Sequence, residues 1–322
     1  MAGKNARWPY GSTAALREDV LRVLGVLKIA TGEQIQCLTR PHLTDRHRHD
    51  PGRRTKPHRN AALDLALHQL TVSEGATREG RKLWGLTTAG LQAAAQVLDR
   101  PLSDMGSTAR GAAAHGAAHA MAVNATVQAL LQPQPDNAQA AQRREGDQAV
   151  LKAAPPGLGR LESIRTEVPL LITGSESAPG HGSPQADLVL RAPEHDLPVA
   201  FVQVDRGTVT PARLAQKANS YHAYFTRAGK HSTPWWRQHW HTPAGDPVLL
   251  YVFTAHSETA ALDRARQTMA LLHERDLPFP VLGTLLPRLQ QRGPWGDAWW
   301  HAARGGNPRP LDEALSFAHD RP

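Results

Sequence analysis

The sequence predicts an α+β or α/β protein of two domains, the first mostly helical and the second built around a mixed sheet. A chain of 322 residues suits two domains of ordinary size. In the first third of the chain, apolar residues recur at spacings of three and four, as in amphipathic helices. From about residue 148 the pattern changes to β-branched runs between turns, and helical segments separate the later runs. Alternating strands and helices indicate a mixed or parallel sheet covered by helices.

The first domain is predicted over residues 13–100 as a winged helix-turn-helix. Three helical segments, a hairpin and a closing helix follow one another, and this order is typical of that DNA-binding fold. The third helix would enter the major groove. The expected elements cover residues 14–30, 32–38, 60–71, 75–86 and 89–98.

A strongly basic segment, residues 40–59, precedes the third helix and is predicted to be a loop. It has seven Arg or Lys against two Asp, and three prolines. We expect it to lie over DNA phosphates. The third helix is expected to present His58, Asp64 and His68 away from the core, together with Asn60 and Gln69, which can reach base edges. The hairpin is expected to contact the minor groove or the DNA backbone. The alternative is a solvated loop beside an ordinary three-helix core. The residues expected at DNA are Arg46, Arg48, Arg53, Arg54, Lys56, Arg59, Asn60, Gln69, Arg78, Arg81 and Lys82.

The composition favours a polyanionic partner inside the cell. The formal net charge is +8, and no basic stretch has the apolar helix face that membrane binding needs. The sequence has one cysteine, Cys37, so no disulfide can form within it, and the first twenty residues lack an apolar export signal. We therefore expect a cytoplasmic protein that binds double-stranded DNA and no membrane.

The second domain is predicted over residues 148–287, after a linker and helix at 101–147 and before an irregular, Trp-containing tail at 288–322. Two helices are expected between its later strands, at residues 211–226 and 258–275. Strands are expected at residues 148–153, 162–172, 186–191, 198–204, 247–254 and 280–285.

Acidic and amide side chains gather on the central strands of this predicted sheet. Asp187 begins one strand, and Gln203 and Asp205 share a face of the next because side chains alternate with a period of two. If Asp187 lies across from them, the oxygens provide the environment that Mg²⁺ prefers. Lys217 can reach this site from the following helix, and Glu167 can complete it. The candidate catalytic residues are Asp187, Gln203, Asp205 and Lys217, and the candidate metal ligands are Asp187, Asp205 and Glu167, with Mg²⁺ as cofactor if the site is active.

This layout resembles the PD-(D/E)xK nuclease fold, in which an acid on one strand and an acid-x-lysine on the next hold a metal ion. Together with the winged helix, VQVDRGT at residues 202–208 and a Lys-x-x-x-Tyr helix, the chain resembles the replication-relaxation family of bacterial plasmids and other mobile elements. The resemblance covers roughly residues 14–285 and implies a role in plasmid DNA replication or mobilisation. It rests most on Asp187, Asp205, Arg206, Gly207, Thr208, Lys217 and Tyr221.

Two positions depart from the nuclease pattern. Gln203 stands where the pattern has a carboxylate, and Asp205 stands where it has lysine. Activity would then need Lys217 to replace the missing lysine. Otherwise the acids end strands, and residues 206–208 form a turn and a helix cap in a domain that only clamps DNA.

The expected function is therefore DNA binding in plasmid or mobile-element replication or mobilisation, with a nuclease-like domain whose activity the sequence leaves open. One alternative is an active Mg²⁺-dependent endonuclease. Another is a winged-helix transcriptional regulator whose second domain senses a ligand or mediates self-association. A second copy of the chain and replication or transfer proteins are the candidate protein partners.

Tryptophans in the second half of the chain form two groups. They either stack on unpaired bases or cover a hydrophobic edge, and the covering role is favoured because Trp is large and usually mostly buried. The groups are Trp235, Trp236 and Trp240, then Trp295, Trp299 and Trp300.

Overall fold

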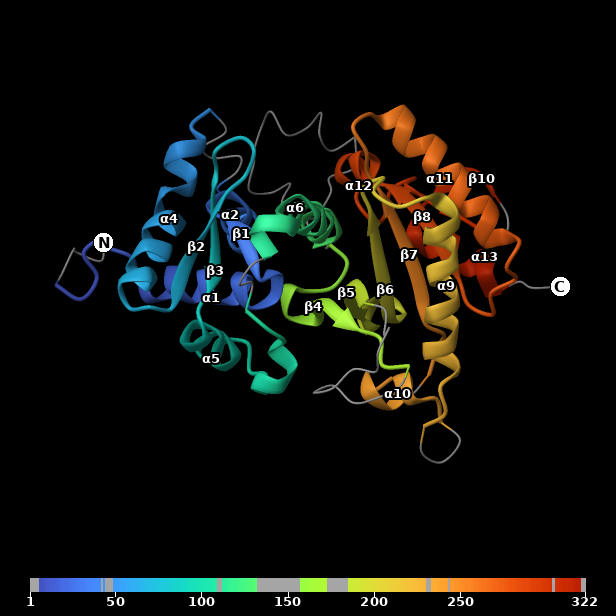
Figure 1. Ribbon diagram of the computed structural model, residues 1–322, viewed down its shortest axis with the longest axis horizontal. Coiled ribbons are helices and arrows are strands. Elements are labelled where there is room, and N and C mark those ends of the chain that lie inside the picture. Colours follow the sequence, from blue (N-terminus) through green and yellow to red (C-terminus); the bar gives the residue numbers. More distant parts are fainter. Residues whose placement is uncertain are drawn as a thin grey trace. The chain divides into compact units, whose positions relative to one another are not determined.

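The computed structural model of the chain divides into two compact units, Met1–Asn124 and Ala125–Pro322 (Figure 1). The strand predicted at 148–153 lies outside the described residues. The structure describes residues 6–41, 43, 49–108, 112–131, 157–172, 185–229, 233–242, 244–302 and 305–319.

The first unit combines helices with a small antiparallel sheet in the order β1-β3-β2. The predicted order of helix, helix, helix and hairpin is confirmed, with a short strand added between the first two helices. The elements are α1 (Ala14–Leu27), β1 (Ile29–Thr31), α2 (Gly32–Thr39), α4 (Pro51–Leu67), β2 (Thr71–Ala76), β3 (Lys82–Leu86), α5 (Thr88–Val97), a 3₁₀ turn (Leu102–Met105) and α6 (Ala112–Leu131), which runs past the boundary between the units.

Side-chain caps set the starts of these helices. Thr13, Thr31 and Thr87 each accept a hydrogen bond from a backbone N–H in the first turn of the helix that follows, and Thr31 forms a full capping box with Gln34. Behind the caps, the apolar stripe of α1 is buried against α4 and α5. The sequence pattern and the structure agree for α2 and α5. They also agree for the start of α1, but this helix ends at Leu27 rather than at Ala30, because Ile29–Thr31 pair with β3.

The basic segment before the third helix is different from its prediction. Residues 51–59, expected to belong to a loop, form the first half of α4, which begins at Pro51 rather than at Asn60. Asp50 caps this helix by accepting a hydrogen bond from the Arg53 N–H at 2.9 Å. Pro51 stands in the first turn, where a missing N–H costs nothing. Two of the three prolines that suggested a loop, Pro51 and Pro57, therefore lie in a capped helix. The cations in this helix are Arg53, Arg54, Lys56 and Arg59.

The second unit is built on a seven-stranded mixed sheet in the order β10-β9-β8-β7-β6-β5-β4. β6, β7 and β8 are parallel to one another, and the other neighbours are antiparallel. The main elements are β4 (Ile164–Pro169), β5 (Gln185–Ala192), β6 (Leu197–Asp205), α9 (Pro211–Thr226), α10 (Trp235–His239), β7 (Val248–Phe253), α11 (Glu258–His273), β8 (Val281–Leu285), α12 (Leu286–Arg292), β9 (Trp299–His301), β10 (Gly305–Arg309) and α13 (Leu311–His319).

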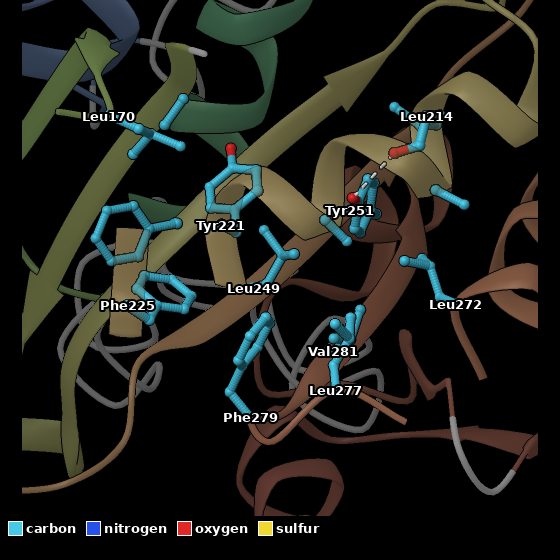
Figure 2. Packing of buried hydrophobic residues seen from close by; sticks show 14 of the residues in the cluster. Leu170, Leu214, Tyr221, Phe225, Leu249, Tyr251, Leu272, Leu277, Phe279 and Val281 are labelled. Atoms are coloured by element: carbon cyan, nitrogen blue, oxygen red, sulfur yellow. Dashed lines mark hydrogen bonds between the residues drawn. The ribbon is translucent and has the colours of Figure 1, made fainter. Parts of the chain in front are cut away.

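The parallel strands need helical crossovers, which α9 and α11 supply. One large apolar cluster joins α9, α10 and α11 to the strands (Figure 2). In it, Tyr221 and Phe225 of α9 lie with Leu249 and Tyr251 of β7. Every residue of β7 is buried, as expected for a central strand of a parallel segment.

The tail, predicted to be irregular from residue 288, instead contains α13 and two short strands that extend the sheet beyond β8. β9 has three residues and β10 has five, and the register shifts between them. Strands this short leave no alternating pattern of apolar and polar residues in the sequence. They could be recognised only once β8 was in place to pair with β9.

Candidate functional site

Exposed cationic side chains gather on two elements of the first unit. Three lie on the first half of α4 at spacings of three, which makes them neighbours along one side of the helix. Three more lie on the β2–β3 hairpin, at its tip and on the first residue of β3. These six residues, called the cationic surface below, are Arg53, Lys56, Arg59, Arg78, Arg81 and Lys82.

The hairpin holds its cations in a defined turn. The Thr77 N–H donates to the Arg81 carbonyl at 2.8 Å, and the Gly80 N–H donates back to the Thr77 carbonyl at 2.9 Å. Gly80 has φ of 76°, a conformation that glycine adopts without strain. Beside this turn, the Lys82 ammonium lies 4.1 Å from the ring centre of buried Trp84.

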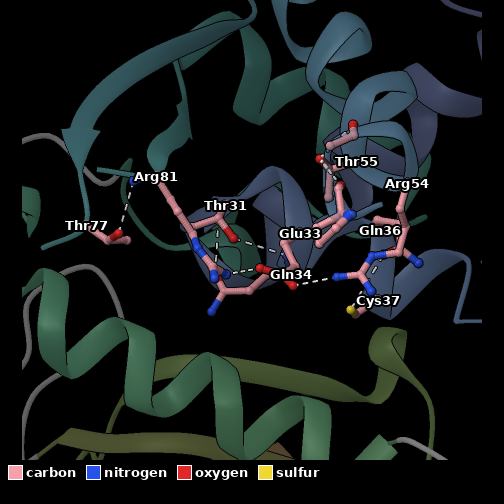
Figure 3. Close-up of polar contacts among 11 residues, drawn as sticks. Thr31, Glu33, Gln34, Gln36, Cys37, Arg54, Thr55, Thr77 and Arg81 are labelled. Carbon is pink, nitrogen blue, oxygen red and sulfur yellow. Dashed lines mark hydrogen bonds and ion pairs between the residues drawn. The ribbon is translucent and has the colours of Figure 1, made fainter. Parts of the chain in front are cut away.

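Glu33, in the first turn of α2, links α4 to the hairpin (Figure 3). Its Oε1 accepts from Arg54 Nη2 at 2.6 Å, and its Oε2 pairs with Arg81 Nη1. Because both arginines reach the same carboxylate, α4 and the hairpin approach one point of the unit. Arg54, predicted to contact DNA, is only 8 % exposed.

Two residues expected to face away from the core are wholly buried. Asp64 accepts hydrogen bonds from the backbone N–H groups of Tyr10 and Ser12, at 2.9 and 3.0 Å, and from the Ser12 hydroxyl at 2.5 Å. His58 Nε2 lies 3.2 Å from Thr39 Oγ1. The expectation was wrong because the N-terminal segment and α2, distant in sequence, cover this side of α4 with polar partners.

The two residues predicted to read bases have different surroundings. Asn60 donates from Nδ2 to the Tyr10 carbonyl at 3.1 Å, so its amide is already engaged by the N-terminal segment. Gln69 is exposed just after α4, with φ of 57°. Base reading by either residue stays a prediction. Arg46 and Arg48 lie outside the described residues.

A buried polar network that the sequence did not reveal fixes the orientation of α4. Asp19 of α1 accepts from Arg40 Nε at 2.9 Å and lies 3.6 Å from His58 Nε2. Burial raises the pKa of Asp19, but hydrogen bonds with His58 and Arg40 outweigh this and hold the pKa below its usual value. A buried acid inside an apolar helical stripe was the available signal for this network.

In the second unit, three of the predicted catalytic residues meet. Asp187 Oδ2 accepts from the Val204 N–H at 2.6 Å and from the Gln203 side-chain amide. Gln203 Oε1 in turn accepts from Lys217 Nζ and from the Tyr221 hydroxyl, the latter at 3.4 Å. Burial lowers the pKa of Lys217, although the nearby Asp187 carboxylate opposes this shift. Lys217 was part of the site prediction and Tyr221 of the family resemblance, and α9 brings both side chains to Gln203.

The other two predicted metal ligands, Asp205 and Glu167, do not take part in these hydrogen bonds. Asp205 is 2 % exposed and binds Arg264 of α11 through both carboxylate oxygens. Arg264 also donates to the Val209 carbonyl, which ties the loop after β6 to α11. Glu167 is exposed on β4 with φ of 55°. Arg264 was not predicted from the sequence, because nothing in the spacing relates it to Asp205.

The carboxylates as they stand do not make a ligand set for Mg²⁺. The carboxylate of Asp205 forms an ion pair with Arg264, and that of Asp187 accepts hydrogen bonds from Gln203 and from the backbone of β6. Within the described parts of the chain, no group of three or more His, Cys, Asp or Glu side chains is arranged to hold a metal ion. The magnesium site stays a prediction.

The comparisons with known proteins decide the family. A model of the family described as replication-relaxation matches residues 21–234, which is more than half of the chain. The chain belongs to the replication-relaxation family. The family resemblance predicted from the sequence is thus confirmed, and it suggests a role connected with plasmid replication. Comparison with curated proteins and with solved structures gave no match.

The part that matches the replication-relaxation family contains the cationic surface and the residues Asp187, Gln203 and Lys217, but it ends before Arg264. None of the described helices is both long and apolar enough to cross a membrane. Trp236, Trp240 and Trp299 are at most 3 % exposed, which confirms the covering role for these three.

Proposed function

We propose that this replication-relaxation protein binds duplex DNA of a plasmid or another mobile element, in the cytoplasm, during its replication or mobilisation. In this proposal the first unit is a winged helix, with α4 as the groove-binding helix and the β2–β3 hairpin as the wing. The observation that carries the proposal is the cationic surface. Its six exposed Arg and Lys side chains lie on the two elements that this fold places against DNA.

The chemistry of the surface fits phosphate. Cations on α4 and on the hairpin can neutralise several backbone charges, and the released counterions make binding strongly dependent on salt. Three polar side chains of α4 that were expected to face away from the core are used inside the unit: those of His58, Asn60 and Asp64. This favours binding dominated by backbone contacts and by the shape of the DNA.

The test is an affinity measurement with the full chain and a labelled duplex at several salt concentrations. Replacing Arg53, Lys56 and Arg59 by Ala should make the negative slope of log affinity against log salt shallower by about 0.9 for each lost phosphate contact. A matched control removes the same charge from exposed positions of the second unit, Arg213, Arg266 and Arg309. Equal effects of the two triple changes would remove α4 from the proposed interface.

The meeting of Asp187, Gln203 and Lys217 favours a second candidate, a Mg²⁺-dependent endonuclease. The engagement of Asp205 by Arg264 counts against it, because a bound Mg²⁺ would have to displace that ion pair. DNA binding is therefore the leading proposal. Three other roles stay as proposals that no feature of the described residues favours. They are self-association, binding of replication or transfer proteins, and regulation at promoters.

A further inference from the structure

We propose that the Glu33 carboxylate occupies, in the DNA-free protein, a binding position for a DNA backbone phosphate, and that a phosphate replaces it between Arg54 and Arg81 when duplex binds. This inference rests on the proposed DNA-binding function and adds to it a specific phosphate site and a residue that competes for the site. The position lies where α2, α4 and the β2–β3 hairpin meet (Figure 3).

The contacts at Glu33 are those that a phosphate would make. Each carboxylate oxygen has its own guanidinium, Arg54 on Oε1 and Arg81 on Oε2. Carboxylate and phosphate oxygens accept the same charge-assisted hydrogen bonds from arginine. Two arginines held on one anion by two different elements thus form a site that either anion can fill.

The surroundings also favour an anion. Glu33 lies in the first turn of α2, where the helix dipole attracts negative charge. Arg59 passes close to the same helix start, since a Cβ added at Gly32 would lie 2.8 Å from Arg59 Cγ. Arg54 is 8 % exposed, and its Nε is buried. Arg54 is therefore held in place beside Glu33, and its Nε–H makes no hydrogen bond in the described structure.

The two arginines differ in a way that permits exchange. The side chain of Arg81 is 58 % exposed on the hairpin, so it can exchange Glu33 for an arriving phosphate at small cost. The side chain of Arg54 is 9 % exposed and stays in place. Glu33 then repels the phosphate until the remaining contacts of the cationic surface are made, which penalises DNA that engages the surface incompletely.

The experiment compares Glu33→Gln with Glu79→Gln in the full chain, using anisotropy of a labelled duplex. Glu79 is an exposed carboxylate on the β2–β3 hairpin and accepts a hydrogen bond from Thr77. Because both residues are glutamates, the two changes alter the net charge of the protein by the same amount. Glu33→Gln should tighten binding about three- to tenfold more than Glu79→Gln, and it should do so for duplexes of different sequence. Equal effects of the two changes would overturn the inference.

Arg81→Ala separates the mechanism from a general charge effect. In that background Glu33→Gln should lose most of its gain, and an undiminished gain would contradict the proposed exchange. Arg81→Ala alone should make the negative slope of log affinity against log salt shallower by about 0.9, whereas removing an arginine that only holds Glu33 would leave the slope unchanged. The salt dependence of Arg81→Ala tests the proposal even if Glu33→Gln fails to fold. If the wild-type chain binds no duplex at low salt, the proposed function itself fails, which is a different result.

Discussion

Two buried carboxylates, those of Asp64 and Asp19, link the helices of the first unit through hydrogen bonds and ion pairs. Asp64 joins α4 to the segment before α1 through three hydrogen bonds, and Asp19 joins α1 to α2 and α4. The sequence marked Asp64 as a polar residue on the DNA-binding helix. Its true role depends on Tyr10 and Ser12, more than fifty positions earlier in the chain, which periodicity within one helix cannot reveal.

Asp64 should make the first unit sensitive to acid. Burial raises its pKa, but hydrogen bonds from Ser12 and Tyr10 and the charge of Arg17 lower it below the ordinary value of 3.8. The stabilisation is therefore present above pH 4 and is lost as the pH falls through the lowered pKa. Urea unfolding should show Asp64→Asn destabilised by about 1–3 kcal/mol at pH 7, with a smaller loss on acidification than wild type. An unchanged pH profile, or an equal effect of Asp263→Asn at an exposed site, would contradict this role.

The ion pair of Asp205 with Arg264 should stabilise the second unit. Arg264→Ala leaves a 2 % exposed carboxylate without its partner and should cost about 3–5 kcal/mol, whereas Arg266→Ala on the exposed side of α11 should cost little. Thermal unfolding with and without millimolar Mg²⁺ checks whether these carboxylates bind a metal ion instead. We expect no Mg²⁺-dependent shift in wild type. A rise in Tm with Mg²⁺ would contradict this expectation.

At the scale of elements, the predicted core helices and central strands depend on local patterns, and these were recognisable. α9 has the predicted bounds, 211–226, because Thr210 and Pro211 mark its start and its apolar stripe is regular. β7 is a continuous apolar run, and β6 and β8 have no polar residues other than Gln203, Asp205 and Thr284. The start of α4 was missed because composition favoured a loop, while one cap, Asp50, decides its structure.

The cap of α4 can be tested directly. Asp50→Ala removes the acceptor for the Arg53 N–H and should cost about 1 kcal/mol, while Asp50→Asn should cost much less because Asn also caps helices. The first turn carries Arg53, so Asp50→Ala should also weaken duplex binding. Chemical denaturation and anisotropy measure the two effects. Equal results for Ala and Asn would mean that the cap does not hold this turn.

Over the whole molecule, the net charge of +8 predicted a polyanionic partner, and the family match agrees with a role connected with plasmid replication. The sequence placed candidate residues in both units, but only the structure separates their roles. It leaves six cations exposed on α4 and the hairpin and joins Gln203 and Lys217 to Asp187. Asp205 joins Arg264 instead, a pairing between β6 and α11 that depends on how the chain folds.

Hydrogen–deuterium exchange of the full chain, free and saturated with duplex DNA, tests the central claim most directly. If α4 and the hairpin bind DNA, amide exchange should slow in the first turns of α4 and at residues 77–82. Strands of the second unit, such as β7, should be unaffected. Bound duplex with unchanged exchange in α4 and the hairpin, or with slowing confined to the second unit, would contradict the account.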